Sequence, residues 1–140
     1  MYDLSACLSN ANDFFEISSI IDCKRTEFEY KYLSVYGTNL SFSCELYLKY
    51  LLLKNSCSLE KIQKRGHNLK KLFNLLQKNF SSVAEIILEY YDQECPRNDI
   101  ENLLASDGAN FMDFRYLYEK RKDGKDKQIH SSDLAIFARA

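Results

Sequence analysis

Residues that break helices or form tight turns are scarce in this chain, which has one Pro and four Gly among 140 residues. Because Gly and Pro mark the turns between short strands, their scarcity favours long helices. Trp is absent, but ten Tyr, nine Phe and a hydrophobic fraction of 46% supply enough apolar material for one core. We therefore expect an all-α fold, an up-and-down bundle of four to five helices, in a single domain over residues 1–140.

Paired cysteine motifs are also absent. The cysteines are odd in number, widely spaced and never arranged as C-x-x-C, so neither a disulfide framework nor a thiolate zinc site is expected: Cys7, Cys23, Cys44, Cys57 and Cys95. The only two histidines, His67 and His130, have no second ligand at metal-binding spacing, so we expect no metal. Phosphate-binding and dinucleotide loops are missing, which removes the usual cofactors. Without a leader or a long apolar run, the chain is expected to be cytoplasmic and not membrane-bound.

Apolar periodicity is strongest over residues 39–54, where the apolar belt extends nearly all round the predicted helix. Such a helix must be buried on more than one side. Weaker patterns predict a first helix with a break near residues 24–26, a linker at 58–68 and a helix over 69–80. Ser82 and Glu85 read as a capping box that opens the next helix. Further helices are predicted over 100–118 and after a cap at Ser131 or Ser132.

The net charge of −1 conceals blocks of opposite sign. Residues 61–80 contain six basic and no acidic side chains, whereas 81–119 contain two basic and nine acidic ones. Residues 120–140 are basic again, with six basic and three acidic side chains. Two basic islands, Lys61–Lys71 and Lys120–Lys127, are either solvated surface or candidate contacts for a polyanion.

Two pairs of opposite charge stand four residues apart, the spacing of an ion pair within a helix. Glu45 and Lys49 lie on the most apolar helix, either at its solvent edge or in a partly buried interface where they need mutual pairing. Arg115 and Glu119 are flanked by aromatic residues, so Arg115 either pairs inside the bundle or grips a phosphate or carboxylate. Both interpretations place Arg115 in a partly buried position.

His67 follows Lys64 and Arg65 and directly precedes a predicted helix. In that position an imidazole can cap the helix, pack against it, or act as a base or hydrogen-bond donor. Together with the two ion pairs, these three residues form the predicted binding set.

Three segments in a fixed order resemble the HEPN domains of prokaryotes: Asn39–Leu52 (NLSFSCELYLKYLL), Gly66–Phe73 (GHNLKKLF) and Phe114–Glu119 (FRYLYE). The resemblance covers about residues 35–120. It implies a bundle of four or five helices that commonly dimerises, in a family tied to toxin–antitoxin modules, abortive infection and defence against phage. Many HEPN proteins are metal-independent ribonucleases in which an Arg and a His, separated by four to six residues, meet those of a second protomer. Other members lack this motif and bind partners.

This chain departs from the catalytic spacing. Arg65 and His67 have one residue between them, and Arg121 and His130 have eight. Arg121 and His130 are the nearer candidates by position, and they would supply a cation for the phosphate and an imidazole for proton transfer.

Three functions stay open at this stage. The favoured one is a homodimeric HEPN-like protein of a prokaryotic defence or stress system that binds RNA or a protein partner, such as an antitoxin, without cutting. The second is a ribonuclease toxin that uses Arg121 and His130. The third is a non-catalytic accessory subunit whose apolar helix docks on another protein.

Overall fold

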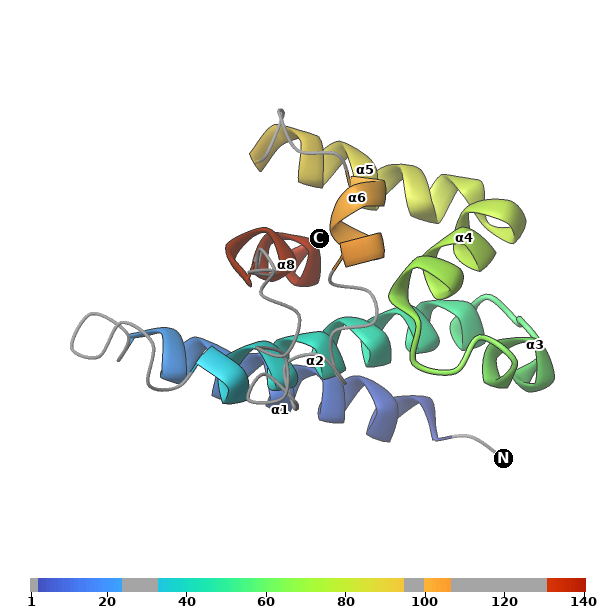
Figure 1. The fold of residues 1–140 in the computed structure, drawn as a ribbon. Helices are drawn as coiled ribbons and strands as arrows, with labels where there is room; N and C mark the ends of the chain where they lie inside the picture. Colours follow the sequence, from blue (N-terminus) through green and yellow to red (C-terminus); the bar gives the residue numbers. More distant parts are fainter. Residues whose placement is uncertain (1–2, 24–32, 95–99, 107–130) are drawn as a thin grey trace, which may run out of the picture.

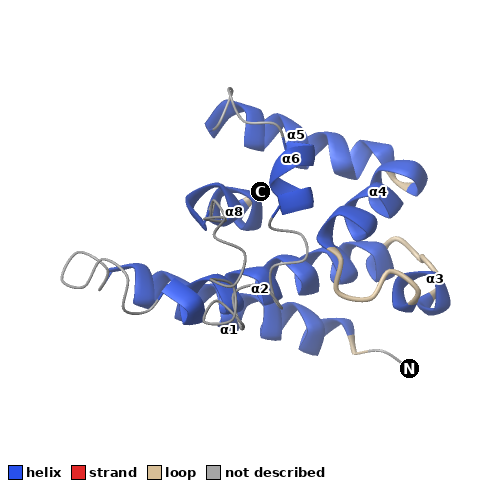
Figure 2. Ribbon diagram, viewed as in Figure 1, coloured by secondary structure: helices blue, strands red, loops and turns tan. Residues whose placement is uncertain are grey.

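The structure, a computed structural model, describes residues 3–23, 33–94, 100–106 and 131–140, and most of these residues are helical. These ranges contain seven helices and no strand (Figures 1 and 2). In chain order the helices are α1 (Leu4–Cys23), α2 (Leu33–Lys54), α3 (Leu59–Gln63), α4 (Leu69–Asn79), α5 (Ser81–Glu94), α6 (Ile100–Ser106) and α8 (Ser131–Arg139). The all-α prediction is confirmed. The predicted number of four to five helices is too low, since the five-residue helix α3 carries little periodic signal and lies in a segment predicted as a linker. Helix α6 covers the start of the helix predicted over 100–118, of which residues 107–118 lie outside the described ranges.

Helix α2 lies at the centre of the described structure. It is packed by α1 on one side and by α3, α4 and α8 elsewhere (Figure 1). Its buried stripe repeats once per turn and is less than 4% exposed at each position: Tyr36, Leu40, Cys44, Leu48 and Leu52. The prediction that this helix is buried on more than one side is confirmed.

Helices α1 and α2 form a hairpin held by apolar and polar contacts. The rings of Phe14 and Phe42 stack with centroids 5.3 Å apart. Ser43, which is fully buried, donates its hydroxyl proton to the Ala11 carbonyl at 2.9 Å. Ala11 is also fully buried, and its small side chain allows the two backbones to approach. Two polar groups of α2 and α1 are thereby satisfied inside the hairpin.

Helix α2 begins earlier than predicted and ends at Lys54, as predicted. The helix begins at Leu33 and not at residue 39, because Tyr36 continues the stripe of Leu40 one turn earlier. At the other end, Ser56 adopts a left-handed conformation with φ 66°. Its N–H donates to the Leu53 carbonyl and that of Cys57 to the Leu52 carbonyl, which is the Schellman arrangement. The chain then turns into α3, a helix in the segment predicted as a linker.

The start of α5 corrects the predicted capping box. Helix α4 ends at Asn79, and Phe80 leaves helical geometry with φ −142° and ψ 58°. The Phe80 carbonyl then accepts hydrogen bonds from Val83 and Ala84, so α5 begins at Ser81. Ser82 is therefore inside the first turn and is not the cap. The serine pattern gave the correct helix with a boundary two residues late, a common size of error.

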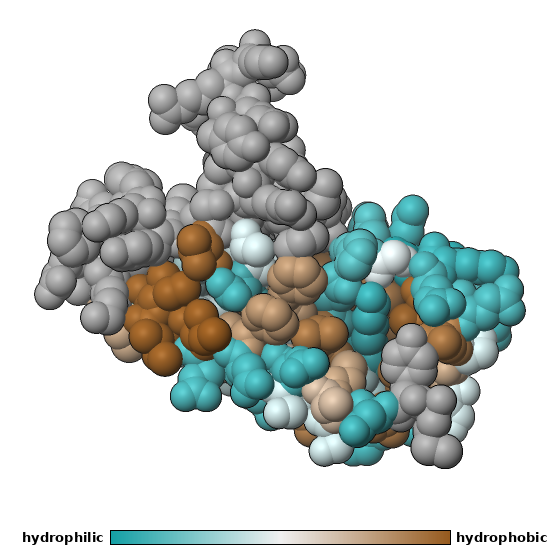
Figure 3. All heavy atoms as spheres, turned by 90° about the horizontal axis from the view of Figure 1, so that it is seen from below, coloured by the Kyte–Doolittle hydropathy of each residue, from teal (hydrophilic) through white to brown (hydrophobic). Residues whose placement is uncertain are grey.

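Part of the surface formed by α1 and α2 is apolar. Ile17, Ile20 and Val35 are about half exposed, at 47%, 53% and 51%, near the end where α1 finishes and α2 begins. Figure 3 shows clusters of apolar side chains on the face of the molecule that contains α1. No helix in the described ranges has both the length and the apolar composition needed to cross a bilayer.

The contact between Phe73 and Phe137 should be a main source of stability. Phe73 of α4 is 1% exposed, and its ring meets that of Phe137 of α8 edge to face with centroids 5.7 Å apart. We expect Phe73→Ala to lower the free energy of unfolding by about 3–5 kcal/mol in urea denaturation. Ile86→Ala is the matched control, because Ile86 is 63% exposed, and it should change stability by no more than about 0.5 kcal/mol. Similar losses in both variants would contradict the placement of Phe73.

Candidate functional site

The turn between α3 and α4 positions the first group of predicted site residues. Gly66 has φ 58°, a left-handed conformation that other residues adopt only at a cost. The N–H groups of Arg65 and Gly66 donate to the Ile62 and Gln63 carbonyls, both at 3.0 Å. Asn68, and not His67, caps α4 by accepting the Lys71 N–H at 2.9 Å. His67 is therefore released from capping and can point its ring elsewhere.

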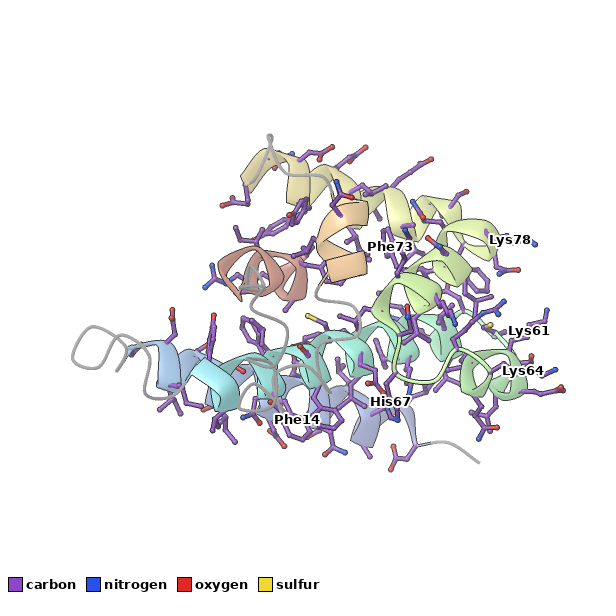
Figure 4. The ribbon with its side chains drawn as sticks, in the orientation of Figure 1. Phe14, Lys61, Lys64, His67, Phe73 and Lys78 are labelled. Atoms are coloured by element: carbon purple, nitrogen blue, oxygen red, sulfur yellow. The ribbon has the colours of Figure 1, made fainter. Side chains whose placement is uncertain are left out.

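The His67 ring points to α2, where it meets a buried carboxylate (Figure 4). Its Nδ1 lies 2.9 Å from Glu45 Oε1 and 3.0 Å from Oε2. Lys49 Nζ lies 2.6 Å from the same Oε1. Because an ionised carboxylate only accepts hydrogen bonds, Nδ1 carries the proton. We call these three residues the Glu45 cluster.

Burial decides what the Glu45 cluster does. The Glu45 side chain is 4% exposed, whereas Lys49 is 23% and His67 63% exposed. A carboxylate at that depth needs close partners of opposite charge or strong donors, and Lys49 and His67 supply both. Of the two predicted interpretations, a solvent-edge pair is wrong for Glu45. The cluster ties the α3–α4 turn to the central helix.

Cys7 of α1 lies beside the same part of α2. Its thiol donates to the Leu46 carbonyl at 3.6 Å. Burial raises the pKa of the Cys7 thiol, and the positive charge of Lys49 opposes that shift without cancelling it. Cys7 is thus a protonated, weakly reactive thiol near neutral pH.

On the α4 side of the turn, a shallow cavity of about 270 Å³ is lined by residues that we call the basic groove: Arg65, Lys71, Asn74, Leu75 and Lys78. The three cations are exposed, and none of them has an ion pair with a carboxylate among the described residues. No acidic side chain is among these lining residues. The basic groove is therefore a concave surface of unneutralised positive charge.

Other basic residues of the same island behave differently. Lys64 forms a pair with Glu60 at 2.6 Å, and both side chains are largely exposed, at 68% and 77%. Figure 4 shows Lys61, Lys64 and Lys78 at the end of the molecule formed by α3 and α4. Lys64 thus belongs to the same positive surface but has a partner of its own.

The structure brings together only part of the predicted binding set. Glu45, Lys49 and His67 meet in one cluster, Arg65 lines the basic groove, and Lys64 lies next to it. The remaining predicted residues lie outside the described ranges: Arg115, Glu119, Arg121 and His130.

Lys71 ends the basic island predicted over Lys61–Lys71, but sequence reasoning left it out of the predicted binding set and missed Asn74 and Lys78. Asn74 and Lys78 follow Lys71 by three and seven residues, so all three lie on one face of α4. That spacing was the available signal, although it did not show that Arg65 joins them. Among the described residues, no three His, Cys, Asp or Glu side chains form a possible metal-ligand set. The chemistry that these residues support is the binding of anions.

A double-mutant cycle tests the Glu45 cluster. Glu45→Gln keeps the shape but removes the charge, and His67→Ala removes the ring. Because the hydrogen bond joins a charged, buried acceptor to its donor, we expect a coupling energy of roughly 1 kcal/mol in urea denaturation. Glu45→Gln with Lys64→Ala is the control cycle and should show additivity within about 0.3–0.5 kcal/mol. Additivity in both cycles would contradict the tie between α2 and the turn.

Alkylation by iodoacetamide at mildly alkaline pH tests the surroundings of Cys7. Cys23 is exposed and should react first, Cys7 is half-buried and should react more slowly, and Cys44, at 1% exposure, should react last. Since burial raises the pKa of Cys7, its rate should still increase with pH in the range where the thiol of a small model peptide is already ionised.

Lys49→Gln extends the alkylation experiment. It removes the charge that favours the Cys7 thiolate and should slow Cys7 further at a fixed pH. Lys54→Gln, on the same helix, is the matched control. Peptide mapping by mass spectrometry gives all rates at once. Equal rates for Cys7 in the two variants would show that Lys49 does not act on this thiol.

Comparisons with family models, with curated proteins and with solved structures found no significant match to this chain.

Proposed function

We propose that this chain is a HEPN-like protein that binds RNA through the basic groove without cleaving it. The observation that carries the proposal is the groove itself, a cavity with three cations, no acidic lining residue and no ion pair to a described carboxylate. Cations gathered in this way repel one another, and a bound polyanion relieves that repulsion.

The spacing of the groove cations suits a phosphate backbone. Lys71 and Lys78 stand seven residues apart on α4, about 10 Å along the helix axis. Arg65 adds a guanidinium from the turn, which can hold a phosphate in a bidentate manner. Asn74, between the lysines, offers an amide that donates hydrogen bonds to phosphate oxygens.

The groove favours recognition of the backbone over recognition of sequence. No aromatic side chain is among its described lining residues, so the stacking platforms of single-strand binders are missing there. Contacts to phosphates fix position and carry no sequence information. We therefore expect weak sequence preference and strong dependence on salt.

The Glu45 cluster contributes to this function indirectly. Arg65 and His67 are separated by Gly66 alone, and the bond from His67 to Glu45 holds the turn on α2. The cluster thereby fixes the place of Arg65 relative to the lysines of α4. In this proposal Glu45, Lys49 and His67 position the turn and do not contact the RNA.

RNA is preferred to other polyanions because of the ordered resemblance to HEPN proteins. The same resemblance supports three further parts of the proposal: a homodimer, a cytoplasmic location and a role in prokaryotic defence or stress. For a dimer, the exposed side chains of Ile17, Ile20 and Val35 offer an apolar surface. A ribonuclease that uses Arg121 and His130 is the alternative within the same family, and it predicts cleaved RNA.

Fluorescence anisotropy with a labelled single-stranded RNA tests the proposal. With three phosphate contacts, the slope of log affinity against log salt should be about −2, which weakens binding roughly twentyfold between about 50 and 200 mM salt. Lys71→Gln should weaken binding about threefold to tenfold and reduce the slope by about 0.7.

Lys64→Gln is the matched control, since it removes the same charge from the same island at a residue that pairs with Glu60. It should change affinity less than Lys71→Gln. Equal effects of the two variants would show that RNA binds to the positive surface in general and not to the groove. Absence of RNA binding at low salt would contradict the proposed function. Loss of full-length RNA that His130→Ala prevents would favour the ribonuclease alternative.

A further inference from the structure

We infer that the chain has a second binding site, unrelated to the basic groove, for a small aliphatic carboxylate. The site is a cavity of about 400 Å³ between α2 and α8, which α1 and α5 help to close. This volume lies in the range of small-molecule sites, which are mostly apolar with a few polar groups that orient the ligand.

The wall of the cavity is apolar and comes from four helices: Phe15, Leu48, Leu51, Ile87 and Phe137. Leu48, Ile87 and Phe137 are 2%, 6% and 5% exposed, so this part is shielded from solvent. Removal of an aliphatic chain from water into such a space is favourable in proportion to the area buried. The interior therefore suits the chain of the ligand.

The polar groups of the cavity select the head group. Arg139 is the only charged side chain among its described lining residues; it is exposed and has no ion pair with a described carboxylate. The hydroxyl of Tyr47 donates to Asn12 Oδ1 at 2.7 Å. Burial raises the pKa of this phenol, so it stays neutral. A carboxylate at the rim can pair with the Arg139 guanidinium through two parallel hydrogen bonds, which neither an alcohol nor an ammonium group can form.

Isothermal titration calorimetry with hexanoate, octanoate and decanoate measures both parts of the site. Each added CH₂ should improve the affinity roughly fourfold until the cavity is full. Octanol and octylammonium, which have the same chain, should bind more weakly than octanoate. Equal affinities along the series, or equal affinities for the three head groups, would overturn the inference.

Two variants locate the site. Arg139→Gln should weaken octanoate about threefold to tenfold and leave octanol unchanged. Ala138→Phe places a ring at a lining position and should abolish binding of both, provided that circular dichroism shows native helix content. Unchanged octanoate binding in a folded Ala138→Phe protein would exclude this cavity.

A measurement on the unaltered chain avoids any folding defect of these variants. Nuclear Overhauser effects between octanoate protons and the Phe137 ring or the Ile87 methyl groups are expected, and contacts only to other residues would overturn the assignment. Lys71→Gln, which weakens RNA binding in the proposed function, should leave octanoate affinity unchanged. The proposal of the RNA site and that of the carboxylate site can thus be refuted independently of each other.

Discussion

Burial of α2 on several sides is the constraint on which the rest of the structure depends. With α1, α3, α4 and α8 packed around it, this helix leaves little of its surface to water. Most of its buried polar side chains therefore have partners inside the protein, although the hydroxyl of Ser41 has none among the described residues. Ser43 finds one in the Ala11 carbonyl, and Glu45 finds two in Lys49 and His67.

The partners of Glu45 link the core to the charged surface. A carboxylate that is 4% exposed is stable only when its charge is compensated, and the compensation comes partly from a turn distant in sequence. Gly66 gives this turn the left-handed residue that it needs, and Asn68 starts the next helix directly after His67. The cationic side of α4 then faces the same edge as Arg65. Packing in the core thus fixes where the positive charge gathers.

The parts of the fold that sequence predicted are those with local periodic signals. The stripe from Leu40 to Leu52 arises from spacing within a single helix, whereas the cap of α4 is Asn68 and not the predicted candidate His67. By contrast, α3 is five residues long and too short to show a period. The ion pair of Glu45 with Lys49 was visible as an i, i+4 pair, but the approach of His67 was not, since it spans 22 residues. The groove combines Arg65 with α4 through tertiary packing, which no local pattern records.

Helix α2 contributes to both proposed sites, and this limits which substitutions can affect one site without the other. Cys44, Leu48 and Leu51 form part of the apolar cavity, while Glu45, on another face of the same two turns, holds the turn that carries Arg65. A substitution in this part of α2 changes core packing, and packing defects spread to all neighbours in a dense interior. Loss of RNA or octanoate binding after such a substitution would therefore reflect a folding defect and not the loss of a ligand contact. The exposed cations of the two proposed sites, Arg139 at one and Arg65, Lys71 and Lys78 at the other, can be replaced with the core left intact.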